Sequence, residues 1–260
     1  MSSLVLDSIT PLIITYNEEP NVGRVLERLR WASRVLVVDS QSSDRTREIA
    51  CSFDNVEVLE RPFESFADQC RFGLSQIDSE WVLSLDSDYV CSERLIQELG
   101  RLEPSPRTGG FSVSFRYCVN GRPLRGTLYP DRVVLHRRHA VYTQDGHAHR
   151  VKVVGTVRTL SGTIDHDDRK PLSAWLEAQA RYAELETAKL RETPASELGR
   201  VDRLRRGGVV MPFLMPLYCL FGKRLLLDGP AGWYYTLQRT YAEILLALRI
   251  WDERLRGDAD

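Results

Sequence analysis

The chain has 260 residues, of which 43% are hydrophobic and 27% are charged, and its formal net charge at pH 7 is −1. This length fits one large domain, or one domain with an appendage, and the composition is that of a globular chain rather than a disordered one. The near-neutral charge gives no overall indication of a nucleic-acid partner.

The first hundred residues alternate between strand-like and helix-like segments. Short apolar runs predict strands over 11–15, 35–38, 56–59 and 81–85. The intervening and following segments predict helices over 20–30, 43–51, 65–77 and 92–101. This alternation indicates an α/β fold with a parallel, doubly wound sheet.

The pattern changes after the prolines and glycines of 104–110. Residues 111–166 form an expected small antiparallel β segment, in which the Asn120-Gly121 pair predicts a tight turn. After Pro171 the sequence has helical spacing, with a further helix expected over 232–254. We therefore divide the chain into a first half (1–103), a mixed segment (104–170) and a helical tail (171–260).

The run Trp81-Val-Leu-Ser-Leu-Asp-Ser-Asp88 ends a predicted strand with two carboxylates. In an extended chain, residues two apart point to the same side, so Asp86 and Asp88 can face one point past the strand's carboxyl end. Open α/β sheets bind ligands at that edge. Two carboxylates there suit Mg²⁺ or Mn²⁺, which usually bind together with the phosphates of a substrate. The alternative is a strand that ends in an ordinary polar turn.

Two other predicted strands also end in polar segments, which are Thr15–Glu19 and Asp39–Thr46. Because the strands are neighbours in the predicted sheet, three polar strand ends should converge on one edge. Neither segment has the glycine pattern of a dinucleotide-binding site or a P-loop, which disfavours both kinds of site.

Three runs together carry a resemblance to a known family. They are Ile13-Ile-Thr-Tyr-Asn-Glu-Glu, Val37-Val-Asp-Ser-Gln-Ser-Ser-Asp-Arg-Thr and Trp81-Val-Leu-Ser-Leu-Asp-Ser-Asp. The chain resembles family 2 glycosyltransferases of the GT-A fold, and within them the lipopolysaccharide-core glucosyltransferase-like branch. The resemblance is strong over about the first 90 residues and looser through His166 and at Leu227-Asp-Gly229.

This resemblance implies a metal-dependent, inverting hexosyltransferase. The donor would be a UDP-sugar, and the acceptor would be a hydroxyl group of a glycan or lipid-linked molecule, such as lipopolysaccharide core or a similar cell-envelope glycan. Residues 1–170 would form the GT-A catalytic domain. Its first half would bind the nucleotide sugar, and 104–170 would serve the acceptor and the metal.

The resemblance also implies roles for single residues in the donor pocket. Thr15, Tyr16 and Glu18 would line the nucleotide site, and Asp39 would bind the uracil edge. Gln69 and Arg71 fall where the family often contacts the donor; the alternative is that both lie on a solvated helix face.

Asp88 would hold the Mn²⁺ or Mg²⁺ ion, with Asp86 nearer to the ribose and the sugar. Members of the branch often continue this motif with Glu, whereas Tyr89 stands here. The substitution removes a supporting carboxylate from the implied metal site.

The general base is expected in the segment 142–150. In-line attack by an acceptor hydroxyl needs a carboxylate or an imidazole that takes its proton. The branch usually carries a His-Glu pair there, and alignment through Arg150 puts His149 in place of the Glu. Asp145 is then our first choice, with His149 or His147 as alternatives. A polar loop with a tight Asp-Gly turn is the structural alternative.

A second cluster of charges follows the last predicted strand, at Ile164–Lys170. In the family, a His at the end of the corresponding strand often completes the metal site, which implies His166 as a ligand. Neutral imidazole suits Mn²⁺ better than Mg²⁺. Alternatively, Asp167 or Asp168 caps the helix that begins near Pro171.

The tail has a basic flank (Arg200–Arg206), an apolar run (Val209–Phe221) and an aromatic cluster (Trp233–Tyr235). The run is shorter than the roughly 20 residues that span a bilayer. We expect this tail to lie on an anionic membrane surface. Burial against the catalytic domain or a second subunit is the alternative, and the sequence leaves the oligomeric state open.

The expected location is the inner face of the cytoplasmic membrane, as a peripheral protein. The N-terminus has no basic segment followed by a long apolar core, so we expect no signal peptide. The five cysteines are widely spaced and form no CxxC or zinc pattern, which favours reduced thiols in a cytoplasmic protein.

Two other functions compete with glycosyl transfer. A pseudoenzyme that only binds nucleotide sugars would explain Tyr89 and the missing His-Glu pair. A sugar nucleotidyltransferase would share the architecture, but it normally wraps a triphosphate in a glycine-rich first loop, and Thr15–Glu19 contains no glycine.

Overall fold

The computed structural model describes residues 6–145 and 148–257, and it divides into two compact units. The first unit contains the main sheet and extends to Lys170, and the second contains the helices from Pro171 onward together with the short segments Leu124–Gly126 and Asp145–Ala148. Each unit is described by itself below.

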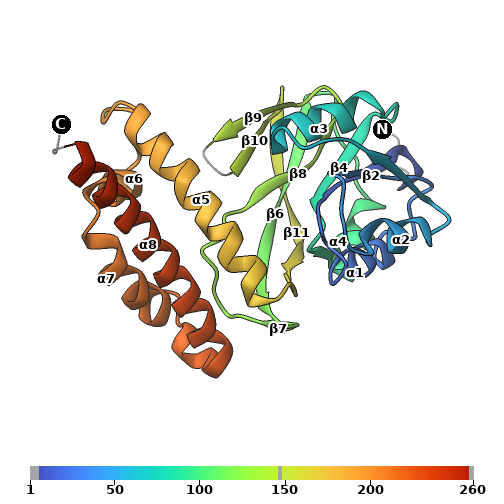
Figure 1. Cartoon of the computed structure of the whole chain (residues 1–260). Coiled ribbons are helices and arrows are strands. Elements are labelled where there is room, and N and C mark those ends of the chain that lie inside the picture. The colour runs from blue at the N-terminus through green and yellow to red at the C-terminus, as the bar shows by residue number, and fades with distance from the viewer. Residues whose placement is uncertain (1–5, 146–147, 258–260) are drawn as a thin grey trace. The chain divides into compact units, whose positions relative to one another are not determined.

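The first unit opens with a short 3₁₀ helix, η1 (Leu6–Ser8), and then alternates strands with helices (Figure 1). The strands are β1 (Ile9–Thr15), β2 (Val35–Asp39), β3 (Val56–Glu60) and β4 (Trp81–Asp86). The helices are α1 (Val22–Glu27), α2 (Thr46–Cys51), α3 (Phe66–Ser75) and α4 (Glu93–Leu99). The four strands pair in the order β3-β2-β1-β4, and all three pairings are parallel.

The rest of the sheet is mixed in direction. Its strands are β5 (Tyr89–Cys91), β6 (Thr108–Val119), β7 (Arg122–Pro123), β8 (Arg132–Arg137) and β11 (Thr156–His166). The order continues β4-β8-β6-β11-β5, in which β8 is antiparallel to both neighbours, β11 is parallel to β6 and β5 is antiparallel to β11. A separate two-stranded sheet pairs β9 (Val141–Asp145) with β10 (Ala148–Lys152).

The parallel strands are buried on both faces, as all seven residues of β1 and all five of β2 show. Successive side chains point to opposite faces. Ile13 and Val37 therefore pack in one core cluster with residues of α1, α2 and α4, whereas Leu12 and Leu36 pack in another with residues of α3. Helices on both faces of a mostly parallel sheet confirm the predicted doubly wound α/β class.

The predicted turn at Asn120-Gly121 is also confirmed, because β6 and β7 pair antiparallel with Val119 opposite Arg122. Both turn residues have positive φ, 49° for Asn120 and 77° for Gly121. Two-residue hairpins of this kind need positive φ at both central positions, which Asn and Gly tolerate best. The sequence did not predict β5, whose three residues directly follow the carboxylate pair.

The second unit is helical. Its helices are α5 (Leu172–Glu192), α6 (Arg200–Gly207), α7 (Val210–Leu217), η2 (Tyr218–Gly222), η3 (Leu225–Asp228) and α8 (Gly229–Gly257). A small core of Leu190, Leu198, Leu246 and Ile250 joins α8 to the segments around it. The predicted helix over 232–254 is confirmed as part of α8.

Candidate functional site

The carboxyl ends of β1, β2 and β4 lie side by side. Thr15 pairs with Asp39 in the β1–β2 ladder, and Ile14 pairs with Asp86 in the β1–β4 ladder. The polar segments that follow these strands therefore meet at one edge of the sheet, where α/β proteins bind ligands.

Asp39 is buried at this edge and holds the first two loops together. Its Oδ2 atom accepts hydrogen bonds from Thr15 Oγ1 (2.8 Å) and Ser42 Oγ (2.6 Å), and its Oδ1 atom accepts one from the Ser42 backbone N–H (2.8 Å). The residue is fully inaccessible to solvent. Each carboxylate oxygen thus already has a hydrogen-bond partner within the protein. The Asp39 side chain therefore fixes the end of β1 against the loop that follows β2.

The loop after β1 is also bonded to the loop after β2. Asn17 has a positive φ of 52°, and its side-chain oxygen accepts from the Ser43 backbone N–H at 2.8 Å. The Glu18 backbone N–H donates to Thr46 Oγ1 at 2.7 Å. These contacts preorganise the loop that carries Tyr16, whose side chain is exposed. Sequence reasoning missed Asn17 and Thr46 as loop-fixing residues.

Asp88 and His166 come together at the end of β4. The His166 Nε2 atom lies 3.0 Å from Asp88 Oδ2, and both side chains are largely buried. The contact arises because β5 follows Asp88 directly and pairs antiparallel with the end of β11, where Tyr89 is opposite His166. The Asp167 backbone N–H also donates to the Asp88 carbonyl at 3.1 Å.

Aromatic rings surround His166. The ring centroids of Tyr89, Tyr117 and Tyr129 lie 5.3, 4.9 and 4.7 Å from its imidazole, all in edge-on geometry. Tyr89, at the position where the resemblance implied a supporting Glu, is buried, and its hydroxyl is hydrogen-bonded to that of Tyr129. An aromatic wall therefore occupies the place of the expected supporting carboxylate.

The electrostatics of His166 follow from this enclosure. Burial by itself lowers its pKa, but the charge of Asp88 and the hydrogen bond to it outweigh burial, so the pKa is raised above its ordinary value. Its Nδ1 atom is buried and has no hydrogen-bond partner within the described part of the chain. Imidazole Nε2 is thus the ring nitrogen engaged by the carboxylate.

The donor set of Asp88 and His166 fits a divalent cation. The 3.0 Å between Nε2 and Oδ2 is the length of their hydrogen bond. Adjacent ligands of an octahedral ion with bonds of 2.0–2.1 Å lie about 3 Å apart, so both atoms could bind one ion once Nε2 has given up its proton. No group of three or more His, Cys, Asp or Glu side chains able to hold a metal is found in residues 6–145 and 148–257. The protein would therefore supply two ligands, and the phosphates of a substrate and water would supply the others.

Arg132, on β8, is a cation beside this cluster that sequence reasoning missed. Its guanidinium carbon lies 4.5 Å from the centre of the Tyr129 ring. Burial lowers the pKa of Arg132, but Tyr129, Tyr89 and the carboxylates of Asp86 and Asp88 raise it above its ordinary value. Asp86 and Asp88 thus lie close enough to act on the same groups.

Glu18 sits in a network of buried polar groups. Its Oε1 atom accepts from Lys170 Nζ at 2.7 Å, and its Oε2 atom accepts from Asn21 Nδ2 at 2.8 Å. The same Asn21 amide donates to Asp168 Oδ1 at 2.9 Å. Burial raises the pKa of Glu18 to about 7; Lys170 opposes this rise, and the charge of Asp88 adds to it.

Asp167 and Asp168 do not cap the helix near Pro171, which was the alternative explanation for this acidic run. Pro171 itself is the N-cap of α5, and no side chain caps the helix. Asp167 instead binds Arg24 Nη1 at 2.8 Å and accepts from the Gly121 backbone N–H at 2.9 Å. The acidic run therefore ties the end of β11 to α1 and to the β6–β7 turn.

The two predicted donor contacts on α3 differ in burial. Gln69 is fully buried, and its side-chain amide donates to Ser40 Oγ at 3.0 Å and to the Arg61 carbonyl at 3.2 Å. The alternative of a solvated helix face is therefore wrong for Gln69, because the side chain points inward and joins the ends of β2 and β3. Arg71 is half-exposed and contacts Asp68 at 3.2 Å.

The candidate bases lie on the small two-stranded sheet. Asp145 is the last residue of β9 and His149 lies in β10, but their side chains, and His147 altogether, lie outside the described residues. Tyr142 anchors β9 to the main sheet, because its buried hydroxyl is 2.8 Å from His136 Nε2. The choice of base remains a prediction.

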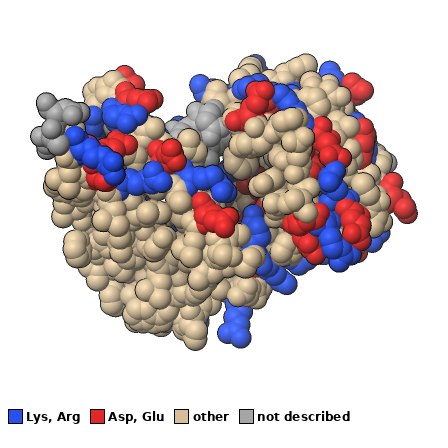
Figure 2. All heavy atoms as spheres, viewed as in Figure 1, with Lys and Arg blue, Asp and Glu red and all other residues tan. Residues whose placement is uncertain are grey.

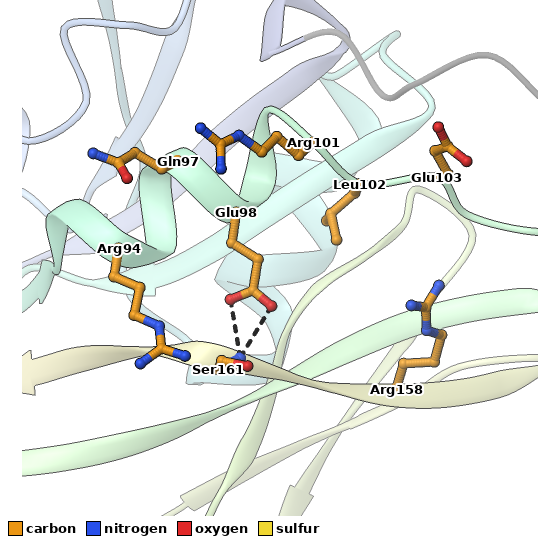
Figure 3. Close-up of a pocket in the computed structure, with 8 residues that line it drawn as sticks. All are labelled: Arg94, Gln97, Glu98, Arg101, Leu102, Glu103, Arg158 and Ser161. Carbon is orange, nitrogen blue, oxygen red and sulfur yellow. Dashed lines mark hydrogen bonds between the residues drawn. The ribbon is translucent and has the colours of Figure 1, made fainter.

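A pocket of about 540 Å³ lies between α4 and β11 (Figure 3). None of its lining residues belongs to the polar groups at the carboxyl ends of β1, β2 and β4. Both carboxylate oxygens of Glu98 face Ser161 there, at 3.1 and 2.9 Å from its backbone nitrogen. Glu98 also accepts from the Gly162 N–H at 2.8 Å. The pairing of β11 with β6 is irregular between Thr159 and Thr163. The hydrogen bonds from Glu98 hold the backbone of this stretch, which gives Glu98 a structural role.

Comparison with known proteins identifies relatives over part of the chain. Residues 11–146 match the model of the family described as glycosyl transferase family 2. An uncharacterised glycosyltransferase of Rickettsia bellii is 33% identical over 100 residues, which are 38% of this chain and 34% of that protein. The lipopolysaccharide core biosynthesis glycosyltransferase LpsC of Rhizobium meliloti is 30% identical over 100 residues, 37% of this chain and 36% of that protein. The chain thus spans about a third of the length of these relatives.

Two solved structures share the fold along most of the chain. TarS of S. aureus, in complex with UDP-GlcNAc, has a TM-score of 0.51 and 12% identity, covering 96% of this chain and 92% of that one. The mannosyltransferase PcManGT of Pyrobaculum calidifontis, in complex with GDP-Man and Mn²⁺, has a TM-score of 0.51 and 15% identity, covering 97% and 88%. The expected GT-A fold is confirmed, and because the family model matches more than half of its residues, the chain belongs to glycosyl transferase family 2.

Proposed function

We propose that the protein is a metal-dependent, inverting glycosyltransferase that moves a hexose from a UDP-sugar to a hydroxyl group of a glycan or lipid-linked acceptor. The observation that carries the proposal is the contact between Asp88 and His166 at the carboxyl edge of the parallel sheet. Membership of the family supports the reaction class. The TarS and PcManGT structures, which contain nucleotide sugars, support the class of donor.

The nucleotide would bind against the bonded loops after β1 and β2. Exposed Tyr16 offers an aromatic face, and Thr15 and Asp39 form the floor beneath it. A uracil N3–H that approached Asp39 would share carboxylate oxygens that already accept from Thr15 and Ser42. Asp86 would lie on the ribose and sugar side.

A divalent cation at Asp88 and His166 would neutralise negative charge on the diphosphate leaving group. The Mn²⁺ in the PcManGT structure supports such an ion. An imidazole ligand favours Mn²⁺ over Mg²⁺. Arg132 adds positive charge near Asp86 and Asp88, and Lys170 adds positive charge near Asp88, which would help to retain a diphosphate.

Transfer with inversion needs a base on the side of the sugar opposite to the diphosphate. Asp145, at the end of β9, is our first choice, with His149 and His147 as alternatives. The base would take the proton of the acceptor hydroxyl while the hydroxyl oxygen attacks the anomeric carbon. The bond from that carbon to the diphosphate oxygen would break, and UDP would leave. The likeness to LpsC supports an acceptor of the lipopolysaccharide-core type.

A nucleotide-sugar-binding pseudoenzyme is the second candidate. It is favoured by the aromatic wall at Tyr89, which leaves the metal site without the additional acid that the resemblance implied. Binding and turnover separate the two functions, because a pseudoenzyme would bind the donor with metal and release no nucleotide.

A panel of UDP-, GDP-, CMP- and dTDP-sugars with Mn²⁺, read by thermal shift, tests the donor. A ligand at 100 times its dissociation constant stabilises the folded protein by about 2.7 kcal/mol, which is readily measured. We expect stabilisation by UDP-sugars that chelation of the metal removes. A preference for GDP- or CMP-sugars would contradict the proposed donor, and donor binding without nucleotide release in the presence of acceptors would favour the pseudoenzyme.

A further inference from the structure

The outward positions of the helical unit between Val209 and Leu248 are almost all apolar, and we call their exposed side chains the apolar face. On α7 and η2 they include Phe213 (72% exposed), Leu217 and Phe221. On α8 they include Trp233, Leu237 (62% exposed) and Leu248. Figure 2 shows a continuous area of uncharged side chains over this unit, with charged side chains gathered along one edge.

The polarity of α8 is the reverse of that of an ordinary surface helix. A helix on the surface of a soluble domain buries its apolar stripe and presents its charges to water. In α8, Glu243 is buried and binds Arg205 Nε at 3.0 Å, and Arg239 packs over the Tyr235 ring at 5.4 Å. Every position of the helix from 233 to 248 that is exposed is apolar or aromatic. Such a face needs a cover other than water.

Within the stretch that forms the apolar face, the exposed charge is positive. Between Val209 and Leu248, Arg224 is the exposed charged residue and Lys223 beside it is partly exposed. The two acids in this stretch are both paired inside the unit, Asp228 with Arg125 at 3.2 Å and Glu243 with Arg205. The surface therefore complements a negatively charged partner.

We propose that the apolar face lies in one leaflet of an anionic lipid bilayer, with Lys223 and Arg224 among the headgroups. An apolar surface that contains Trp and Tyr and is flanked by exposed basic residues is typical of segments that lie in the membrane interface. A second copy of this chain fits less well, because it would bring the same positive rim against itself. The inference goes beyond the proposed function and does not depend on it.

The face lies in the plane of the membrane and does not span it. Among the described residues, no single helix is long and apolar enough to cross a bilayer. Only together are the segments Val210–Gly222 and Leu225–Gly257 long and apolar enough for a span, and they are bent by 70° at the break between them. The inner side of α8 also carries Arg239 and Glu243, which could not face lipid.

Flotation of the full chain with vesicles of 30% phosphatidylglycerol in phosphatidylcholine tests the proposal. We expect binding at low salt that weakens at high salt without vanishing, because the apolar contribution is insensitive to salt. The triple variant Phe213→Asp, Leu217→Asp, Phe221→Asp should bind at least roughly 100-fold more weakly, since each side chain contributes on the order of a tenfold factor or more. Circular dichroism and thermal melting verify that the variant is folded.

The matched control is a second triple variant that introduces three Asp residues at exposed apolar positions outside the apolar face. Phe63→Asp, Val154→Asp, Val157→Asp replaces three exposed apolar side chains of the first unit, and its vesicle binding should stay within a few-fold of the unmodified protein. The pair Lys223→Glu, Arg224→Glu should reduce the preference for anionic over neutral vesicles. The substitution of Arg205 is not a useful test, because Arg205 is paired inside the unit with Glu243.

Quenching by brominated lipids gives an independent readout of the same contact. Bromine in the acyl chains should quench tryptophan fluorescence, and Trp233→Phe should remove part of the quenching, whereas Trp81→Phe, at a buried position of the sheet, should not. If the protein ignores anionic vesicles at low salt, the proposal is wrong. A dimer that the triple variant separates would then identify the apolar face as a subunit contact. Metal-dependent UDP-sugar binding, measured without vesicles, tests the proposed function separately.

Discussion

His166 is held against Asp88 by the rings of Tyr89, Tyr117 and Tyr129, and this packing restricts the imidazole more than a single hydrogen bond would. Edge-on contacts with aromatic rings contribute about 0.5–1.5 kcal/mol each. The imidazole is therefore preorganised beside the carboxylate before a ligand arrives. A preorganised pair loses less side-chain entropy on binding a cation than two free side chains would.

Asp88→Asn tests the role of this carboxylate. The amide keeps the shape of the side chain but removes the charge that a cation needs, so we expect Mn²⁺-dependent stabilisation by UDP to disappear and transfer to fall to background. Asp78→Asn is the control, since that side chain is fully exposed and pairs with Arg138 at 3.4 Å. Normal transfer by Asp88→Asn with Mn²⁺ or Mg²⁺ would show that the metal site lies elsewhere.

Asp145→Asn tests the proposed base. Loss of a general base slows a reaction by roughly 10²–10⁴-fold, and UDP-sugar binding should remain, because the base acts on the acceptor. Single-turnover rates and thermal shifts measure the two effects separately. A near-normal rate would transfer the assignment to His149 or His147.

Because the pKa of Glu18 is raised in the folded protein, we expect the stability of the protein to depend on pH near neutrality. Its pKa is raised from 4.5 to about 7 in the folded protein. Between these two values the folded state holds more protons on this group than the unfolded state, so its contribution to stability falls as pH rises. Glu18→Gln removes the titration, and its melting temperature relative to the unmodified protein should therefore rise from pH 5 to pH 7.5. Parallel curves for the two proteins would contradict the assignment; Glu64→Gln, at an exposed position, is the control.

At the scale of secondary-structure elements, the contact of α4 with β11 helps to position His166, the last residue of β11. Glu98 on α4 holds the backbone N–H groups of Ser161 and Gly162, and β11 ends at His166. The helix approaches the strand so closely that a Cβ atom at Gly162 would lie 2.4 Å from Leu95 Cα. A shift of α4 would therefore displace the strand that carries His166.

Gly162→Ala tests this close approach. The added methyl group collides with backbone atoms that cannot rotate away, so we expect a loss of about 1–3 kcal/mol in the free energy of unfolding. Urea denaturation measures the change. Gly207→Ala is the matched control, because a Cβ atom there meets nothing within 4 Å, and alanine in a helix should be neutral or slightly stabilising. Equal stability of both variants would contradict the packing described for α4.

At the scale of the whole molecule, the sheet unit packs buried side chains on both faces of its sheet, whereas the helical unit exposes apolar side chains along α7, η2 and α8. This contrast follows from the burial of β1 and β2 on both faces and from the single-sided packing of α7 and α8. A unit with one uncovered face depends more strongly on its surroundings than a unit with none.

The reactivity of the five cysteines depends on how deeply each one is buried. Cys51 is exposed, whereas Cys70, Cys91, Cys118 and Cys219 are buried. Burial raises the pKa of the thiols of Cys91 and Cys118 to about 12, and it also raises those of Cys70 and Cys219. The thiolate is the reactive form, so a thiol reagent should label one cysteine rapidly in the native protein and all five in denaturant. Rapid labelling of Cys219 would show that the helical unit opens readily.

The sequence by itself determined the class of the fold and the edge of the sheet where the site lies. The strands ending at Thr15, Asp39 and Asp86 were predictable because fully buried parallel strands are short apolar runs, and their carboxyl ends are marked by polar residues. The turn at Asn120-Gly121 was predictable for a similar local reason, since few residues adopt positive φ.

The resemblance implied that Asp88 and His166 share a site, but only the tertiary structure showed how these two side chains come into contact at that edge. The Asp88–His166 contact depends on the pairing of β5 with β11, and no periodicity links strands so far apart in the chain. The inward side chain of Gln69 and the pairing of Arg205 with Glu243 were likewise hidden, because a polar residue on a helix reads the same whether it faces water or a buried partner. Hydrophobic periodicity is a property of neighbouring residues, whereas the partners of buried polar groups are set by packing across the whole unit.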